Sequence, residues 1–288
     1  NRISSRKLEK STLFKEFVKG LPNRSIHLFN HSFLNKWEVY ELLSKEPRLI
    51  PYLPKTKLFQ GLSSLKTMLK AYPILFIKPI HGAMGRGIFR LSRSWMGYDL
   101  QYSALDGQKY KHFSNLTSLY TFLRKKLRKQ PSIIQEGIPI IHLQERAVDF
   151  RILMQKNKTG NWAVTSSVAR IGPNNRFVSN IARGGEINRI STTLKKCGIT
   201  DPDLITKKMA SIAKLTCEAI DRHHPGHFAE LGVDLAVTRS GKVYLLEINS
   251  KPSKADNTLT LPSQKGRPSV HRLLEYTLFL TTHRKVEV

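Results

Sequence analysis

Residues 232–253 read GVDLAVTRSGKVYLLEINSKPS, a stretch that sets acidic side chains inside two apolar runs. Both runs are rich in residues that favour β-strands, and the Arg-Ser-Gly-Lys segment between them has the composition of a turn. A two-residue turn at Ser240-Gly241 pairs Asp234 with Glu247 across a hairpin. Asn249 lies two residues beyond Glu247 and therefore points from the same face.

The facing acids need a function, because like charges opposite each other destabilise a β-ladder. Two carboxylates and an amide oxygen are hard oxygen ligands of the kind that Mg²⁺ prefers. We therefore predict that Asp234, Glu247 and Asn249 bind a metal ion. The same count opposes Leu235 to Leu246 and Val237 to Tyr244. The alternative is a solvated strand edge with incidental acids, and a register slip of one residue would separate the three side chains.

The composition is that of a basic globular protein. The 288 residues contain 48 Lys and Arg against 21 Asp and Glu, a formal net charge of +27, and could form one large domain or two lobes. The charge favours polyanionic partners such as nucleotides, nucleic acid or acidic polymers, although it could serve solubility alone. No apolar run is long enough to span a membrane. Two cysteines without metal-type spacing suit a reducing cytoplasm. The chain begins at Asn1 without a signal-peptide pattern, so we expect a trimmed fragment.

Strand and helix signals are mixed without regular βαβ alternation, so we predict an α+β fold. Asn35 and Asp201 are expected to cap helices, and Ser114 a third. The expected helices cover 36–43, 63–70, 115–127, 202–222 and 269–281, and the expected strands 74–77, 87–91, 132–135, 146–155, 162–170, 233–238 and 243–248.

A candidate phosphate site lies in ILFIKPIHGAMGRGIFRL, residues 74–91. A strand delivers Lys78, and Gly82, Gly85 and Gly87 permit a loop whose N–H groups can turn towards phosphate oxygens. The spacing does not match a P-loop, and no Rossmann unit follows. A flexible hairpin turn is the alternative for this motif alone. Together with the hairpin acids, it predicts a nucleotide site.

The chain resembles the ATP-grasp superfamily, and most closely its YheC/YheD-type, spore-coat-associated branch in endospore-forming bacteria. The resemblance rests on motifs in a fixed order along nearly the whole chain: NRISSRKLEKS, FNHSFLNKWEVYELLS, LPKTKLF, FIKPIHGAMGRGI, IIQEGIPI, DFRILMQ, SSVARIG, NIARGGEINRI, FAELGVDLAV and LLEINSKPS. It implies two α+β lobes with the nucleotide between them. We expect a remnant of a preceding N-terminal region at 1–30, an N-terminal lobe at 31–130 and a C-terminal lobe at 131–288.

The resemblance also implies roles for individual residues. Lys36 and Lys78 resemble the two nucleotide lysines, and Asp234, Glu247 and Asn249 the ligands of Mg²⁺, with Mn²⁺ as an alternative. The other implied residues are the phosphate loop Gly82, Ala83, Met84, Gly85 and Gly87, the adenine hinge Gln135, Glu136 and Ile138, the catalytic arginines Arg151, Arg170 and Arg183, and the substrate residues Asn180, Gly184, Gly185 and Lys251. After the asparagine the family pattern often reads Ser-x-Pro-Gly, whereas this chain has Ser250-Lys251-Pro252-Ser253.

The implied function is that of an ATP-dependent, ADP-forming ligase. A carboxylate attacks the γ-phosphate of ATP to give an acyl phosphate, and an amine or thiol then displaces phosphate. An acidic peptide is one candidate acceptor, and the expected location is cytoplasmic or spore-associated. Two alternatives stay open: a structural spore-coat protein that retains the fold, and a basic polyanion or nucleic-acid binder. The last is ranked lowest, because no recognition motif supports it.

Overall fold

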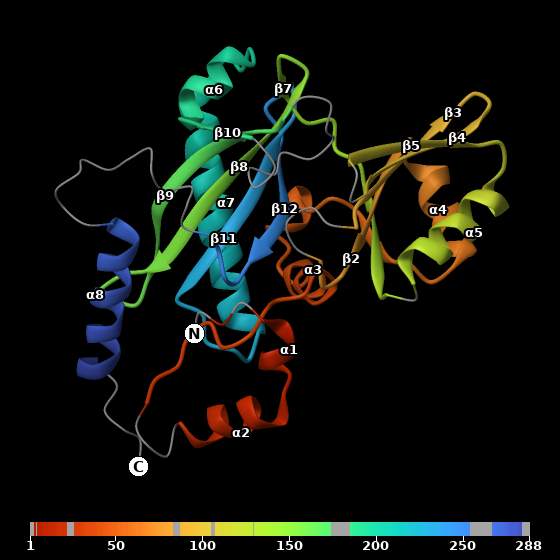
Figure 1. The fold of residues 1–288 in the computed structure, drawn as a ribbon. Coiled ribbons are helices and arrows are strands. Elements are labelled where there is room, and N and C mark those ends of the chain that lie inside the picture. The colour runs from red at the N-terminus through yellow and green to blue at the C-terminus, as the bar shows by residue number, and fades with distance from the viewer. Residues whose placement is uncertain are drawn as a thin grey trace.

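Two six-stranded sheets organise the computed structural model, which describes residue 3 and residues 5–21, 26–82, 87–104, 107–128, 130–173, 185–253 and 267–283. Every strand pairing within these residues is antiparallel. The first sheet has the order β1-β6-β2-β3-β4-β5, and the second β10-β9-β8-β11-β12 with β7 beside β8. The two sheets lie apart and face a shared junction (Figure 1).

The first lobe consists of the first sheet and two helices that cover one of its faces. Leu75 and Ile77 alternate with outward-facing residues along β2, and both are fully buried with Leu119 and Leu123 of α5. Lys78 is therefore on the opposite sheet face, which turns towards the junction. The elements of this lobe are β1 (Thr56–Leu58), α4 (Leu62–Ala71), β2 (Ile74–Pro79), β3 (Phe89–Ser94), β4 (Gly97–Ala104), β5 (Gly107–Phe113), α5 (Leu116–Leu127) and β6 (Ser132–Glu136).

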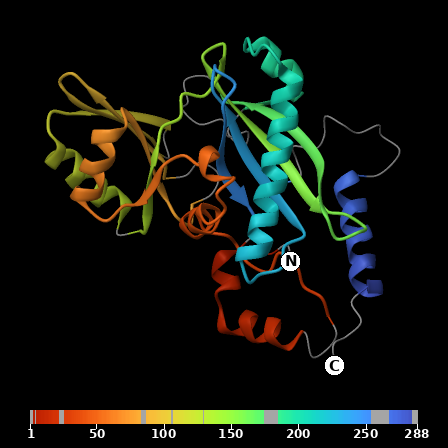
Figure 2. The same ribbon diagram turned by 180° about the vertical axis from the view of Figure 1, so that it is seen from behind.

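The second lobe consists of the second sheet with α7 packed along one face, as the two opposite views show (Figures 1 and 2). Side chains again alternate between the two faces of the sheet. Val233 and Leu235 pack in the core with α7, and Asp234 lies on the opposite face. Its elements are β7 (His142–Leu143), β8 (Arg146–Lys156), β9 (Trp162–Ile171), β10 (Glu186–Asn188), α6 (Ile190–Lys196), α7 (Pro202–His223), β11 (Glu230–Val237), β12 (Val243–Asn249) and α8 (Pro268–His283).

The N-terminal part of the chain lies against the second lobe and leads into the junction. It comprises α1 (Arg6–Glu9), α2 (Thr12–Gly20), α3 (Lys36–Ser44) and η2 (Ile50–Tyr52). Asn30 fixes its path, because the amide Nδ2 donates to the carbonyls of Glu230 and Ser250, each at 2.5 Å. Val39, Leu42 and Leu43 of α3 then join the core of the second lobe.

The predicted caps at Asn35 and Asp201 are confirmed, because their side chains accept from the N–H groups of Glu38 and Leu204 at 2.8 and 2.9 Å. The Ser114 prediction is wrong: Asn115 caps α5 instead. Its side chain accepts from the Ser118 N–H at 2.9 Å, since it stands directly before the first helical residue.

The hairpin pairs Asp234 with Glu247 as predicted, but the rest of the predicted register is wrong. The turn holds three residues rather than two, with Thr238 N–H donating to the Lys242 carbonyl at 2.9 Å and Gly241 at φ +76°. Leu235 therefore faces Leu245. A bulge then shifts the register by one residue between Leu235 and Asp234, so that Asp234 faces Glu247.

The first sheet extends through β6 to Glu136, past residue 130, where the sequence places the boundary between the lobes. Within the described residues, no helix is both long and apolar enough to cross a membrane.

Candidate functional site

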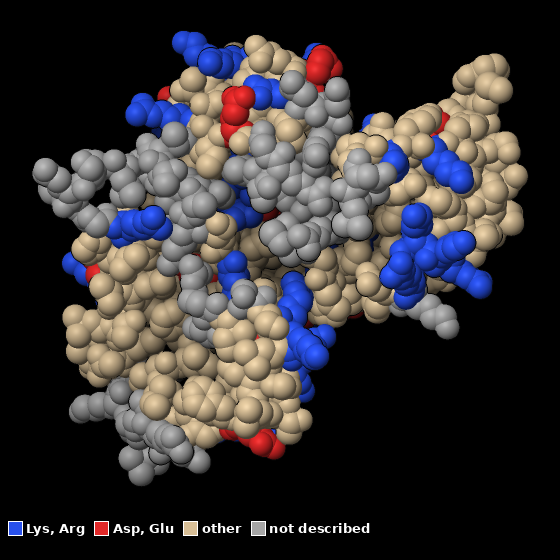
Figure 3. Space-filling view, viewed as in Figure 1, with Lys and Arg blue, Asp and Glu red and all other residues tan. Residues whose placement is uncertain are grey.

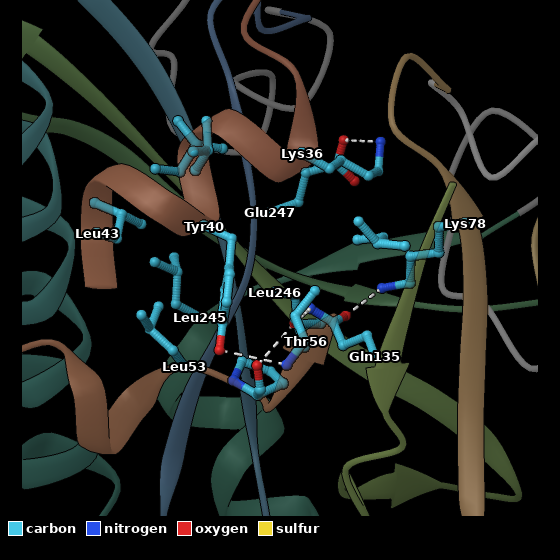
Figure 4. A pocket seen from close by; sticks show the side chains of 14 residues that line it. Lys36, Tyr40, Leu43, Leu53, Thr56, Lys78, Gln135, Leu245, Leu246 and Glu247 are labelled. Atoms are coloured by element: carbon cyan, nitrogen blue, oxygen red, sulfur yellow. Dashed lines mark hydrogen bonds and ion pairs between the residues drawn. The ribbon is translucent and has the colours of Figure 1, made fainter. Parts of the chain in front are cut away.

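A narrow pocket with a cavity volume of about 40 Å³, partly open to solvent, lies between the two sheets. Side chains of α3, β1, β2, β6 and β12 line it, so both lobes contribute. Figure 4 shows an apolar end formed by Leu43, Leu53 and Leu245, and an opposite end with charged side chains. The pocket therefore offers an apolar surface for a flat base and charges for an anionic group.

Lys36 stands at the charged end and connects the two lobes. It is the first residue of α3, and its N–H donates to the Ile80 carbonyl at 3.0 Å. Its Nζ donates to the Gly82 carbonyl at 2.6 Å and pairs with Glu247 Oε1 at 3.0 Å. The side chain of Lys36 is 13% exposed and that of Glu247 30%, so the ammonium is shielded while the carboxylate stays accessible.

Lys78 enters the pocket from the end of β2. Its Nζ donates to Gln135 Oε1 at 2.6 Å, and Gln135 Nε2 donates to Thr56 Oγ1 at 3.1 Å. Burial lowers the pKa of Lys78 from 10.5 to about 8, Glu247 acts to raise it and Lys36 to lower it. Among the described residues, the Gln135 amide is the one hydrogen-bond partner of this buried ammonium, so an incoming anion would stabilise it.

A row of charged side chains crosses the second sheet on the face opposite α7. Register places Arg170 beside Asp149, Arg151 beside Asp234, and Asp234 beside Glu247, on four adjacent strands. Arg170 makes a two-pronged contact with Asp149, Nε to Oδ1 at 2.5 Å and Nη2 to Oδ2 at 2.8 Å.

Asp234 is the centre of this row. Arg151 contacts both of its oxygens, with Nη2 to Oδ2 at 2.8 Å, and Arg170 Nη2 reaches Oδ1 at 3.1 Å. Asn249 Nδ2 donates to Oδ2 at 3.1 Å. Burial alone would raise the pKa of Asp234, but the two arginines outweigh it and lower the pKa below its ordinary value. Asp234 is therefore ionised at neutral pH.

The predicted metal ligands have the oxygen donors that Mg²⁺ prefers, and in this structure both oxygens of Asp234 are engaged by arginines. Asp234, Glu247 and Asn249 supply carboxylate and amide oxygens from one face of the β11–β12 hairpin. No group of three or more His, Cys, Asp or Glu side chains that could hold a metal occurs in the described part of the chain. Mg²⁺ typically takes one or two carboxylates together with substrate phosphates, and this set matches that pattern.

Charge also argues that a cation and an anion bind together. Three carboxylates of the site, Asp149, Asp234 and Glu247, lie among four cationic side chains, Lys36, Lys78, Arg151 and Arg170. The site is therefore not acidic, and a metal alone gains little from it. Figure 3 shows Lys and Arg side chains on both lobes and along the junction, with few Asp and Glu on this face.

The two described ends of the predicted phosphate loop lie beside Pro79, which directly follows Lys78. Gly82 N–H donates to the Pro79 carbonyl at 3.1 Å. Gly87 has φ +68° and packs against the Pro79 ring, so that a Cβ at residue 87 would lie 3.2 Å from Pro79 Cγ. A side chain at Gly87 would be strained in this conformation. Ala83, Met84 and Gly85 lie outside the described residues, as do Asn180, Arg183 and Gly184 of the predicted substrate loop.

The other predicted residues divide between the pocket and its surroundings. The side chain of Gln135 lines the pocket. The carboxylate of Glu136 instead accepts a hydrogen bond from the Lys55 N–H at 2.9 Å. Ile138 follows β6 in the link between the sheets, and its carbonyl accepts from the Ile140 N–H at 2.9 Å. Gly185 directly precedes β10, at the edge of the second sheet. Lys251 lies beyond β12, where it pairs with Glu9.

The apolar end of the pocket was not predicted. Tyr40 lines it, and its hydroxyl accepts from the Thr56 N–H at 3.4 Å. Tyr40 stands four residues after Lys36, so helical spacing alone could have placed both on one face of α3. Leu53 and Leu245 come from a connector and a strand far apart in sequence, and no local pattern brings them together.

Comparison with known sequences gives a consistent result. A family described as YheC/D like ATP-grasp matches residues 25–280. Endospore coat-associated protein YheD of Bacillus subtilis (strain 168) is 30% identical over 261 residues, 88% of this chain and 56% of YheD. Endospore coat-associated protein YheC of the same organism is 24% identical over 257 residues, 89% of this chain and 70% of YheC. The chain thus spans little more than half the length of YheD.

Solved structures with a similar fold include two N5-carboxyaminoimidazole ribonucleotide synthetases. The ADP complex of purK has a TM-score of 0.50 at 13% identity, over 84% of this chain and 50% of that one. The enzyme from Thermotoga maritima has a TM-score of 0.50 at 12% identity, over 93% of this chain and 56% of that one. At these identities the likeness concerns the fold alone.

Proposed function

The chain belongs to the YheC/D-like ATP-grasp family, and on that premise we propose that it is an ATP- and Mg²⁺-dependent ligase that forms ADP. The reaction joins a carboxylate to an amine or a thiol through an acyl phosphate. One observation carries the proposal: Lys36, Lys78 and Glu247 meet at one end of a pocket whose other end is apolar, and Asp234 stands opposite Glu247 on the neighbouring strand.

The nucleotide would lie along this pocket. Its base takes the apolar end beside Tyr40, and its phosphates take the end with Lys36 and Lys78. The neutral hydrogen bond from Lys78 to Gln135 leaves the ammonium short of negative charge, so phosphate oxygens are its natural partners. Asp234, Glu247 and Asn249 would hold Mg²⁺, which when bound neutralises charge on the phosphates.

The chemistry needs no nucleophile from the protein. A carboxylate oxygen of the substrate forms a bond to the γ-phosphorus, the bond to the β–γ bridging oxygen breaks, and ADP leaves. The amine or thiol then bonds to the acyl carbon and phosphate leaves with the former carboxylate oxygen. Arg151 and Arg170 lie on the same face of the sheet with their forked donors paired to Asp234 and Asp149, and we assign them to the substrate carboxylate and the transferred phosphoryl group.

Trapping of the acyl phosphate tests this proposal without knowledge of the acceptor. The protein is incubated with ATP, Mg²⁺ and a panel of amino acids, dicarboxylates and acidic peptides, and hydroxylamine serves as the amine. We expect at least one carboxylate to give its hydroxamate and an equal amount of ADP. Glu247→Gln should give neither. ADP formation that no carboxylate stimulates, or none at all across the panel, would contradict the ligase.

Spore association is the second part of the proposal. It is supported by the names of the two relatives, both endospore coat-associated proteins. We propose that the chain acts in the cytoplasm of sporulating cells or at the spore, with an acidic peptide as acceptor for its basic surface. A fluorescent fusion followed through sporulation tests the location. Normal coat assembly with Glu247→Gln would favour the structural alternative, and defective assembly would favour the ligase.

A further inference from the structure

The N-terminal helix α1 places an arginine next to the candidate phosphate end of the pocket. The guanidinium carbon of Arg6 lies 4.5 Å from the ring centre of Phe33, and its Nη1 is 3.3 Å from His81 Nδ1. His81 directly precedes Gly82, whose carbonyl accepts from Lys36 Nζ at 2.6 Å. Arg6 and Lys36 therefore contact neighbouring residues of the same segment, His81 and Gly82.

This position is fixed by contacts on both sides of α1. Ser5 caps the helix, its hydroxyl accepting from the Leu8 N–H at 3.3 Å. The Glu9 carboxylate accepts from the Phe33 N–H at 3.1 Å and pairs with Lys251, while Lys251 Nζ also donates to the Ile3 carbonyl at 2.8 Å. The pair Glu9–Lys251 therefore anchors α1 to the end of β12, the strand that carries Glu247 and Asn249.

Arg6 carries a positive charge for which the described part of the chain shows no ionic partner. Within the described residues, no carboxylate lies at ion-pair distance from its guanidinium, and His81 is its one polar contact. Burial lowers the pKa of Arg6 and Glu247 acts to raise it, so the guanidinium is half-buried within electrostatic reach of that carboxylate. Glu247 itself is engaged by Lys36. By contrast Lys251, the other cation on the Phe33 ring, is satisfied by Glu9.

A half-buried guanidinium with unused donors is a binding group for a carboxylate or phosphate. Three basic side chains, Arg6, Lys36 and His81, converge where the 82–87 loop begins. Burial lowers the pKa of His81, and the nearby charges of Lys10, Arg6 and Lys36 lower it further while Glu38 acts to raise it. Lys78 is buried beside Gln135 and lines the pocket with Lys36, whereas Arg6 is half-buried next to His81.

We propose that Arg6 binds the terminal phosphoryl group of the nucleotide triphosphate, so that α1 forms part of the site. The assignment rests on the proposed ATP-binding function and adds to it a residue from the N-terminal region. The forked guanidinium donates to γ-phosphate oxygens, and the anchor through Glu9 and Lys251 sets its position relative to Glu247.

The test compares nucleotides with and without the terminal phosphate. Dissociation constants are measured by calorimetry with Mg²⁺ for ADP and for the non-hydrolysable analogue AMP-PNP. We expect Arg6→Gln to weaken AMP-PNP binding about tenfold or more, as for loss of charge-assisted hydrogen bonds, and to change ADP binding less than twofold. Arg6→Lys should give an intermediate loss. Lys7→Gln removes the same charge from the exposed neighbouring position on α1 and should change neither constant.

The ADP measurement also reports on folding, because a variant with a damaged pocket loses both ligands. Equal weakening of both nucleotides by Arg6→Gln, or unchanged binding of both, would overturn the assignment. If Lys78→Met abolishes binding while Arg6→Gln leaves AMP-PNP unaffected, the Arg6 assignment fails and the nucleotide site stands. If wild-type protein binds neither nucleotide, the proposed function fails with it.

Discussion

Lys78→Met separates a binding role from a structural one, because the two predict opposite changes in stability. At about 1.36 kcal/mol for each pKa unit, the drop of the Lys78 pKa from 10.5 to about 8 corresponds to about 3 kcal/mol against the charged side chain in the folded protein. Methionine keeps the apolar stem and loses the hydrogen bond to Gln135, worth about 1 kcal/mol. At pH 7 we therefore expect the variant without ligand to be more stable than wild type by about 2 kcal/mol.

The pH dependence of this difference follows from the same pKa. Between pH 8 and 10.5 the unfolded chain holds its Lys78 proton more strongly than the folded protein does, so the stability of wild type rises with pH in that window. The advantage of Lys78→Met should fade there. The free energy of unfolding is measured by urea denaturation at pH 7 and near pH 10, with Lys57→Met as a control on an exposed lysine of β1.

Lys78→Met should raise the stability of the ligand-free protein but abolish its stabilisation by MgATP. A ligand at a hundredfold excess over its dissociation constant adds about 2.7 kcal/mol of stability. MgATP should stabilise wild type and Lys57→Met in this way and leave Lys78→Met unchanged. The reasoning is refuted if Lys78→Met loses more than about 1 kcal/mol at pH 7, since Lys78 would then be a structural residue.

Three further predictions concern the charged row, the link between the sheets and the metal. Arg170→Met removes the ion pairs of Arg170 with the buried carboxylates of Asp149 and Asp234 and should cost about 3–5 kcal/mol of stability. Asp149→Asn should cost less, because Arg170 keeps its ion pair with Asp234. Equal losses of stability in urea denaturation would contradict this. Gly137→Ala places a Cβ 2.4 Å from Ile74 Cγ2 and should cost about 1–3 kcal/mol of stability. Gly20→Ala has open space around the new Cβ and should cost nothing. Similar melting temperatures for the two variants would refute this difference. Mg²⁺ alone should shift the melting temperature far less than MgATP does, because the site carries no excess of negative charge; an equal shift would overturn that balance.

The fold class was within reach of the sequence, and the α+β ATP-grasp fold predicted from it is confirmed by the family match and by the structures of similar fold. Helix caps such as Asn35 and Asp201 are local signals and were found. The strands β4 and β5 were missed. Polar and exposed residues fill most of β5, so neither alternation nor an apolar run marks it.

The acid pair shows how a correct contact can follow from an incorrect register. A turn one residue longer than predicted and a bulge before Leu235 shift the strands by equal amounts, and the two errors cancel at Asp234 and Glu247. A bulge has no reliable signal in one sequence. The pairing of Asp234 with Arg151 and Arg170 was also not predicted, since it joins three strands that only the tertiary fold brings together.

Calorimetric titration of ATP into wild type and Glu247→Gln, with Mg²⁺ and with a chelator, tests the central claim most directly. If the facing carboxylates form a site for MgATP, wild type binds ATP at least tenfold more tightly with Mg²⁺, and Glu247→Gln loses that metal dependence. Equal binding of ATP by wild type with and without Mg²⁺, or a metal dependence that survives in Glu247→Gln, would contradict the account.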